Sequence, residues 1–220
     1  MPDLNRLLPG IRYVVVGGTA TSLYMAVRVT KDVDILVCAS ELERVRRVLS
    51  QGGAKFLHPL SFASSLGISG EAWKLTDGTE LDVLWSARSW AKEALAQPNW
   101  DAAGLPIVAL PYLVLLKMDA SRSIDFGDIS RMLGGADDRA LDRVRKVIRK
   151  HLPEVMDDLE GFIQIGRLEF QALPEATPGA GPGGPANAES AGVVVREHRR
   201  QGRLVREHTR RRTKGTKSSP

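Results

Sequence analysis

The order of the apolar patterns constrains the fold of this chain more than any other feature. Short extended segments come first, and after Trp85 the pattern changes to amphipathic helices. Strands followed by helices are typical of α+β folds. We therefore expect an α+β domain, with one mixed β-sheet backed by helices.

The individual segments follow from their apolar periodicity and from the Gly, Ser and Asp turns between them. The expected strands are 13–16, 33–37, 55–57, 72–75, 80–85 and 107–110. The expected helices are 21–27, 41–50, 87–96, 111–122, 125–133, 138–151 and 153–169. Ser40 is a candidate N-cap for the helix at 41–50.

The net charge of +5 is concentrated at the end of the chain. Residues 174–220 hold ten Lys and Arg against four Asp and Glu, or +6, which leaves 21 against 22, or −1, for residues 1–173. The tail begins with a Pro/Gly-rich run and contains V-R-E-H-R-R from Val195 and V-R-E-H-T-R-R from Val205. With few apolar side chains to bury, it is predicted to be a disordered basic tail. Contact with nucleic acid and a solvated tail without a specific partner are both left open.

These patterns predict a domain organisation of 1–135 as the core, 136–173 as a C-terminal helical segment and 174–220 as the linker and tail. No segment approaches the roughly 20 apolar residues that span a bilayer, and the N-terminus does not resemble a signal peptide. We therefore expect a cytoplasmic protein without a membrane partner. Cys38 has no second cysteine to pair with, and we expect it to pack at a strand end.

The segment V-V-V-G-G-T, from Val14 to Thr19, joins a strand to a helix through two glycines. Glycines at such a turn let the backbone approach a ligand closely and turn its N–H groups outward, which suits a phosphate group. Many Gly-Gly turns are only tight turns. The motif becomes informative when it is combined with carboxylates further along the chain.

Three aspartates form the candidate catalytic constellation. Asp32 and Asp34 are two residues apart at the start of a strand, so we expect both side chains on one face. Asp82 alternates with Leu81 and Val83 on a later strand. Carboxylates that converge on one face repel each other unless a divalent cation lies between them. The pattern therefore favours a metal site, although isolated Asp residues at strand starts are often only solvated.

Gly17-Gly18, Arg28-x-Thr30-x-Asp32-x-Asp34 and Asp82 together resemble the DNA polymerase β-type nucleotidyltransferase superfamily. The chain is most similar to its small bacterial members, which are the minimal and the toxin-antitoxin-associated (AbiEii/MenT-like) types, over roughly residues 11 to 135. The resemblance implies the nucleotidyltransferase fold, an NTP such as ATP as donor, and transfer of an NMP to a hydroxyl with Mg²⁺ or Mn²⁺ as cofactor. Thr19 stands where the family usually has Ser.

The resemblance also implies roles for individual residues. Asp32, Asp34 and Asp82 would bind metal, and Asp82 would help to deprotonate the acceptor. The turn formed by Gly17, Gly18 and Thr19 would hold the phosphates. Lys117 and Asp125-x-x-Asp128 resemble two elements of the toxin-type members. Lys117 would meet the triphosphate, and Asp125 or Asp128 would orient the nucleotide or brace Lys117 and Arg122. A Lys that snorkels to solvent and an Asp that caps a helix are the structural alternatives.

Three functions remain open at this level. The leading one is a toxin-type transferase that modifies an RNA end, such as tRNA, or a protein hydroxyl. The second is an antitoxin-type transferase that modifies a partner toxin. The third is a member without catalytic activity that binds a nucleotide or a protein partner, with the basic tail in contact with nucleic acid. The antibiotic-modifying transferases of this fold are a further possibility, because a fold alone does not select a substrate.

Overall fold

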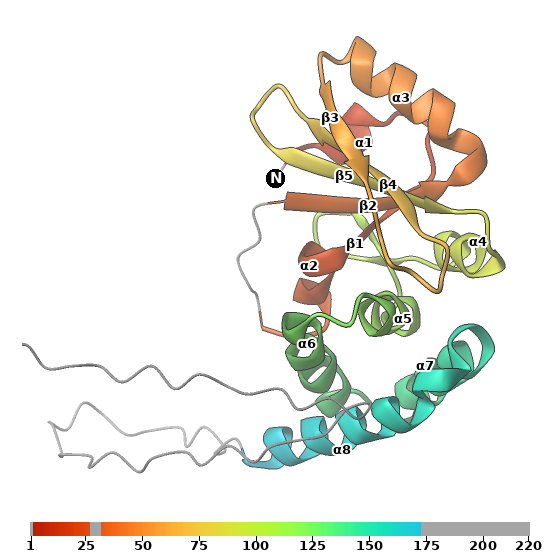
Figure 1. Cartoon of the computed structure of the whole chain (residues 1–220). Coiled ribbons are helices and arrows are strands. Elements are labelled where there is room, and N and C mark those ends of the chain that lie inside the picture. Colours follow the sequence, from red (N-terminus) through yellow and green to blue (C-terminus); the bar gives the residue numbers. More distant parts are fainter. Residues whose placement is uncertain (1, 27–31, 173–220) are drawn as a thin grey trace, which may run out of the picture. The chain divides into compact units, whose positions relative to one another are not determined.

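A computed structural model of the chain describes residues 2–26 and 32–172 (Figure 1). The basic tail and its repeated phrase lie outside the described residues, as do Arg28 and Thr30. No helix in the described ranges is long and apolar enough to cross a membrane.

A mixed sheet forms the centre of the fold. Within the described residues it has seven strands in the order β3-β4-β5-β2-β1-β7-β6. The strands are β1 (Tyr13–Val16), β2 (Asp32–Cys38), β3 (Lys55–Leu60), β4 (Ser69–Lys74), β5 (Glu80–Ser86), β6 (Asn99–Trp100) and β7 (Pro106–Ile107). β2 runs parallel to β5 and antiparallel to β1, so the sheet is mixed.

The helices lie on both faces of the sheet and beyond one of them. They are α1 (Leu4–Leu7), α2 (Gly17–Ala20), α3 (Leu42–Gln51), α4 (Ser89–Ala96), α5 (Leu110–Ala120), α6 (Ser123–Gly134), α7 (Asp138–His151) and α8 (Met156–Ala172). Short 3₁₀ turns are η1 (Thr21–Leu23), η2 (Ala39–Glu41) and η3 (Pro153–Val155). α3 covers one face of the sheet, and α2 and α5 lie on the other (Figure 1). The fold is therefore the expected α+β arrangement of a mixed sheet backed by helices.

Three local predictions are wrong. The strand expected at 107–110 is limited to β7 at Pro106–Ile107, and Leu110 already begins α5. The helix expected at 21–27 begins earlier, at Gly17, and becomes the 3₁₀ turn η1 at Thr21. The chain turns directly from β1 into α2 because Gly17 adopts a φ of +62°. Ser40 does not cap α3, since it lies inside η2 and the N-cap residue is Glu41, which makes no side-chain cap hydrogen bond. α1 and β6 were not expected, because both are too short to show a period.

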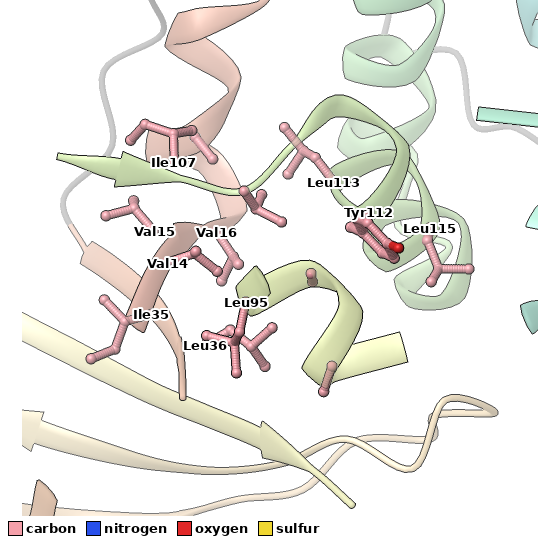
Figure 2. Packing of buried hydrophobic residues seen from close by; sticks show 14 of the residues in the cluster. Val14, Val15, Val16, Ile35, Leu36, Leu95, Ile107, Tyr112, Leu113 and Leu115 are labelled. Atoms are coloured by element: carbon pink, nitrogen blue, oxygen red, sulfur yellow. The ribbon is translucent and has the colours of Figure 1, made fainter. Parts of the chain in front are cut away.

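The core extends from the sheet into the C-terminal helices. Leu36 of β2 packs toward Leu95 of α4, and Leu113 of α5 is also part of this cluster (Figure 2). α7 and α8 add fully buried side chains such as Val144 and Leu159 to the same core. Cys38 ends β2, where it is partly buried against this core and its Sγ lies 3.1 Å from the Ser40 Oγ.

α6 and α8 pack with their backbones in direct contact. A Cβ atom added to Gly166 would lie 2.0 Å from the Ser130 carbonyl oxygen, and one added to Gly134 would lie 2.3 Å from the Gly166 carbonyl oxygen. Nearby, the rings of Phe126 and Phe162 stack at a centroid distance of 5.3 Å. Glycine at both crossing positions is therefore required for this close approach.

Candidate active site

Two of the predicted aspartates face each other across neighbouring strands. β2 and β5 are adjacent and parallel, and their register pairs Asp34 with Asp82. Directly opposite residues share a face of the sheet, so both side chains lie on the face covered by α2 and α5. Asp32, two residues before Asp34, lies on that face as well and is exposed at the first position of β2. The structure thus brings Asp34 and Asp82 together, with Asp32 at the edge.

The Gly-Gly turn lies directly against Asp34. Val16, the last residue of β1, is paired with Asp34, and Gly17 follows it with a positive φ. A Cβ atom on Gly17 would lie 2.0 Å from the Asp34 Oδ2 and 2.6 Å from its Cγ. Both the backbone conformation and the contact disfavour any other residue at this position, because a side chain would be strained and would have to displace the Asp34 carboxylate. Glycine here allows the backbone of the turn to pack directly against the Asp34 carboxylate.

The hydroxyls of the turn hold its own backbone. Thr21 Oγ1 donates a hydrogen bond of 2.6 Å to the Gly18 carbonyl oxygen. Thr19 Oγ1 lies 3.4 Å from the Asp32 carbonyl oxygen, which links the turn to the start of β2. Gly17, Gly18 and Thr19 are thereby held beside β2, the strand that carries both Asp32 and Asp34.

Burial and mutual repulsion raise the pKa values of the facing carboxylates. Burial and the nearby Asp82 raise the pKa of Asp34 to about 6, although Arg122 acts in the opposite direction. Burial and the charge of Asp32 also raise the pKa of Asp82. The site therefore holds carboxylates whose ionised form is unfavourable in the protein alone, and a cation would relieve this cost.

A buried ion network joins α5 to α6 next to these carboxylates. The Lys117 side chain is buried, and its Nζ donates to Asp125 Oδ1 at 2.9 Å and to Asp128 Oδ2 at 2.8 Å. Arg122 Nε donates to Asp125 Oδ2 at 2.6 Å. Burial would raise the pKa of Asp125, but the hydrogen bonds from Arg122 and Lys117 outweigh it, so this pKa lies below its usual range.

This network defines what the predicted nucleotide-binding residues contact in the structure. Asp125 and Asp128 are buried and point at cations of the protein itself. Lys117 borders the cleft, but its ammonium group is already held by these two carboxylates. Arg122 is also paired with Asp125, but its side chain is 68% exposed and lines the same cleft, so it is more accessible than Lys117.

An open cleft of about 610 Å³ contains the site. Asp32, Asp34, Asp82 and Gly17 line one part of it, together with Lys117 and Arg122. The segment 61–64 and Leu84 line another part. Sequence reasoning did not place Phe62, Ser64 or Asp119 at the site. They lie there because of a tertiary contact between segment 61–68 and α5, which leaves no local signal.

The donor chemistry of the site fits a hard divalent cation. Asp34 and Asp82 offer carboxylate oxygens from adjacent strands, and Mg²⁺ is commonly held by one or two carboxylates plus water and substrate phosphates. Within residues 2–26 and 32–172, no three His, Cys, Asp or Glu side chains form a ready metal cage. Asp32, Asp34 and Asp82 therefore do not form such a group in this structure, and Asp32 is exposed at the first position of β2.

The structural neighbours of this chain are remote from it in sequence. No protein-family model and no curated protein sequence matches the chain. A provisionally assigned nucleotidyltransferase from Thermotoga maritima matches 60% of this chain and 91% of its own, with 14% identity and a TM-score of 0.39. The antibiotic-resistance factor ANT(2'')-Ia in solution matches 74% of this chain and 85% of its own, with 15% identity and a TM-score of 0.37. Its crystal structure with adenylyl-2''-tobramycin matches 73% of this chain and 89% of its own, with 14% identity and a TM-score of 0.36. Likeness at this level supports no conclusion about family or function.

Proposed function

We propose that this protein is a metal-dependent nucleotidyltransferase, which moves an NMP from an NTP to a hydroxyl group. The observation that supports this proposal best is that β2, β5 and the turn at Gly17 meet at Asp34. Asp34 faces Asp82 on the next strand, and Gly17 is packed against the Asp34 carboxylate. A turn that brings backbone N–H groups beside paired carboxylates suits a metal-bound phosphate chain.

In the proposed reaction, the acceptor oxygen forms a bond to the α-phosphorus of the NTP. The bond between that phosphorus and the oxygen bridging to the β-phosphate breaks, and pyrophosphate leaves. Asp82 accepts the proton of the acceptor hydroxyl. Its raised pKa suits this task, because a general base works best when its pKa approaches the working pH.

On the donor side, the Gly17-Gly18-Thr19 turn contacts the phosphates through its backbone. Arg122 adds a cation whose guanidinium is oriented by Asp125. Lys117 and Asp128 hold Asp125 and its helix in place, so we assign them a positioning role. A Mg²⁺ or Mn²⁺ ion held by Asp34 and Asp82, with Asp32 nearby, would neutralise the phosphate charge and polarise the α-phosphate.

The acceptor and the biological setting rest on the sequence resemblance alone. We propose an RNA end, such as tRNA, or a protein hydroxyl as acceptor, in a toxin-antitoxin system. Growth arrest caused by this chain alone would support a toxin. Rescue of cells that express a neighbouring toxin would support an antitoxin that modifies its partner.

The assay that tests the proposal is transfer of label from each of four α-labelled NTPs, with Mg²⁺, bacterial RNA and cell lysate. Three proteins are compared: the wild type, Asp34→Asn, and Asp157→Asn as a matched control on the exposed first turn of α8. We expect transfer by the wild type and by Asp157→Asn, and a loss of at least about 100-fold in Asp34→Asn. Label that Asp34→Asn transfers as fast as the wild type would rule the assignment out.

The acceptor follows from where the label appears. Label in RNA favours the toxin-type reaction, and label in protein favours modification of a partner. Mg²⁺-dependent NTP binding without any transfer would instead support the third hypothesis, a binding protein without catalytic activity.

A further inference from the structure

Segment 61–68, which connects β3 to β4, is fixed as a wall of the cleft. Asp119 of α5 accepts two hydrogen bonds from it, one to each carboxylate oxygen. Ser64 Oγ donates to Oδ2 at 2.5 Å, and the Ser65 backbone N–H donates to Oδ1 at 2.8 Å. The carboxylate therefore ties the middle of the segment to α5, which also lines the cleft.

A second anchor holds the same segment from below. The Leu66 carbonyl oxygen accepts a hydrogen bond of 3.0 Å from Ser86 Oγ and one of 2.9 Å from Trp90 Nε1. Ser86 ends β5 and Trp90 lies in α4, and both are buried. Because two separate points fix the backbone, the side chains that precede them are presented to the cleft in a defined place.

Phe62 is the large side chain that this wall presents. A Cβ atom on Gly70 would lie 3.0 Å from Phe62 Cε2 and 2.7 Å from Leu84 Cδ2, so both side chains pack over Gly70. Phe62 is still 42% exposed, and its exposed surface lines the cleft. The ring is thus supported from behind by the sheet while part of it remains accessible.

The apolar surface begins immediately beside the carboxylates. Leu84 lies two residues after Asp82 on β5, on the same face of the sheet, at a spacing of about 6.6 Å. Ile68, Leu113 and Leu116 add further apolar surface to the cleft. The cleft is therefore lined both by charged side chains (Asp34, Asp82 and Arg122) and by an apolar surface that begins at Leu84, next to Asp82 along β5.

We propose that Phe62, supported by Leu84, is the platform on which the base of the nucleoside triphosphate stacks. This inference rests on the proposed nucleotidyltransferase function and adds a determinant of donor binding to it. A nucleoside triphosphate combines a charged phosphate chain with a flat aromatic base, which matches the charged and apolar side chains of the cleft. Stacking on an aromatic ring accepts every base, because each base has a π-face. The platform therefore predicts binding of all four NTPs with similar affinity.

The test measures the contribution of the base to binding apart from that of the phosphates. Each NTP, and inorganic tripolyphosphate, which has no base, is titrated into the protein by calorimetry in the presence of Mg²⁺. The proteins are the wild type, Phe62→Ala, Phe62→Tyr, and Phe56→Ala as a matched control. Phe56 is also exposed, but it packs edge-on against Trp73 and is not among the residues that line the cleft. We expect Phe62→Ala to weaken binding of NTPs by about 10-fold and to leave binding of tripolyphosphate unchanged. Phe62→Tyr and Phe56→Ala should bind both probes like the wild type.

Each other outcome contradicts the platform in a recognisable way. If the wild type binds tripolyphosphate as tightly as NTPs, or if Phe62→Ala binds NTPs normally, the base does not stack on Phe62 and the proposed transferase function is unaffected. If Phe62→Ala weakens both probes equally, the substitution has disturbed the whole cleft, which also counts against the platform. If the wild type binds neither probe, the proposed function fails together with the platform.

Discussion

At the scale of single residues, ionised Asp34 lowers the stability of the folded protein in the absence of a ligand. Burial and the facing Asp82 raise its pKa to about 6, so the folded protein binds a proton here more strongly than the unfolded chain does. The resulting stability is complete below the ordinary carboxyl pKa of 3.8 and is lost as the pH rises through about 6. At neutral pH the metal-free protein therefore carries an unfavourable charge, which the proposed divalent cation would relieve.

Asp34→Asn should consequently stabilise the metal-free protein while it abolishes transfer. The amide removes the buried charge, and we expect a gain on the order of 2 kcal/mol in the free energy of unfolding at pH 8. Urea unfolding at pH 8 and at pH 4 measures it, and the gain should shrink at the lower pH. A variant that is equally or less stable than the wild type at pH 8 would contradict this electrostatic description.

Gly17 offers a second test at this scale, because it combines a positive φ with a contact that excludes a side chain. Gly17→Ala should displace the Asp34 carboxylate and reduce transfer by at least about 100-fold. Gly104→Ala is the matched control, since Gly104 has a φ of +76° but open space around it. The two variants share the backbone strain, so retained activity in Gly17→Ala would show that the contact with Asp34 is not important.

At the residue scale, the sequence predicted on which face of its strand each carboxylate lies, but it predicted less about the residues around them. Alternation in two strands was enough to assign Asp34 and Asp82 to one face each. A Lys in an apolar helix must reach solvent or an anion, and the resemblance offered Asp125 or Asp128 as its brace. The structure has Lys117 bonded to both carboxylates, a geometry that depends on how α6 packs against α5. The contact of Asp119 with Ser64 joins residues far apart in the chain, and no local pattern encodes it.

At the scale of elements, the C-terminal helices depend on the glycine crossing between α6 and α8. Gly166→Ala should destabilise the protein by roughly 2 kcal/mol or more, because its methyl group meets the Ser130 backbone and not a movable side chain. Gly161→Ala in the same helix is the control, since nothing lies within 4 Å of its added Cβ. It should be stabilising by about 0.5–1 kcal/mol. Thermal unfolding of the two variants measures whether each substitution lowers or raises stability. Equal effects would contradict the close contact between α6 and α8 at Gly166.

The ion network between α5 and α6 gives a second prediction for elements. Lys117→Met would leave Asp125 and Asp128 buried without this cation, and we expect a loss of roughly 3–5 kcal/mol in the free energy of unfolding. Lys146→Met on the exposed face of α7 should change it by less than about 0.5 kcal/mol. A Lys117→Met protein that unfolds at the same urea concentration as the wild type would show that the network does not hold these helices together.

Element prediction succeeded where a period was long enough to be read. α7 begins and ends where its amphipathic pattern indicated, at Asp138 and His151. Short elements gave less information: α2 has four residues, and its start is determined by the backbone freedom of Gly17 and not by apolar spacing. The ends of β3 and β4 extend beyond their apolar residues because pairing within the sheet continues through polar positions.

At the scale of the whole molecule, strand order converts separate motifs into one cleft. β2 lies between β1, which ends in the Gly-Gly turn, and β5, which carries Asp82. The sequence indicated an α+β fold, but it did not determine this order, because pairing between distant strands has no local signature. The same arrangement brings Asp34 and Asp82, α5 and segment 61–68 to one cleft.

If the cleft transfers a nucleotidyl group, the acceptor receives the α-phosphorus of the NTP and not the γ-phosphorus. The protein is incubated with Mg²⁺, RNA and lysate, once with α-labelled and once with γ-labelled NTP. We predict that α-label becomes attached to a macromolecule and that γ-label is released as pyrophosphate, with both signals lost in Asp34→Asn. Transfer of the γ-label to the acceptor, or the same transfer by Asp34→Asn, would contradict the account.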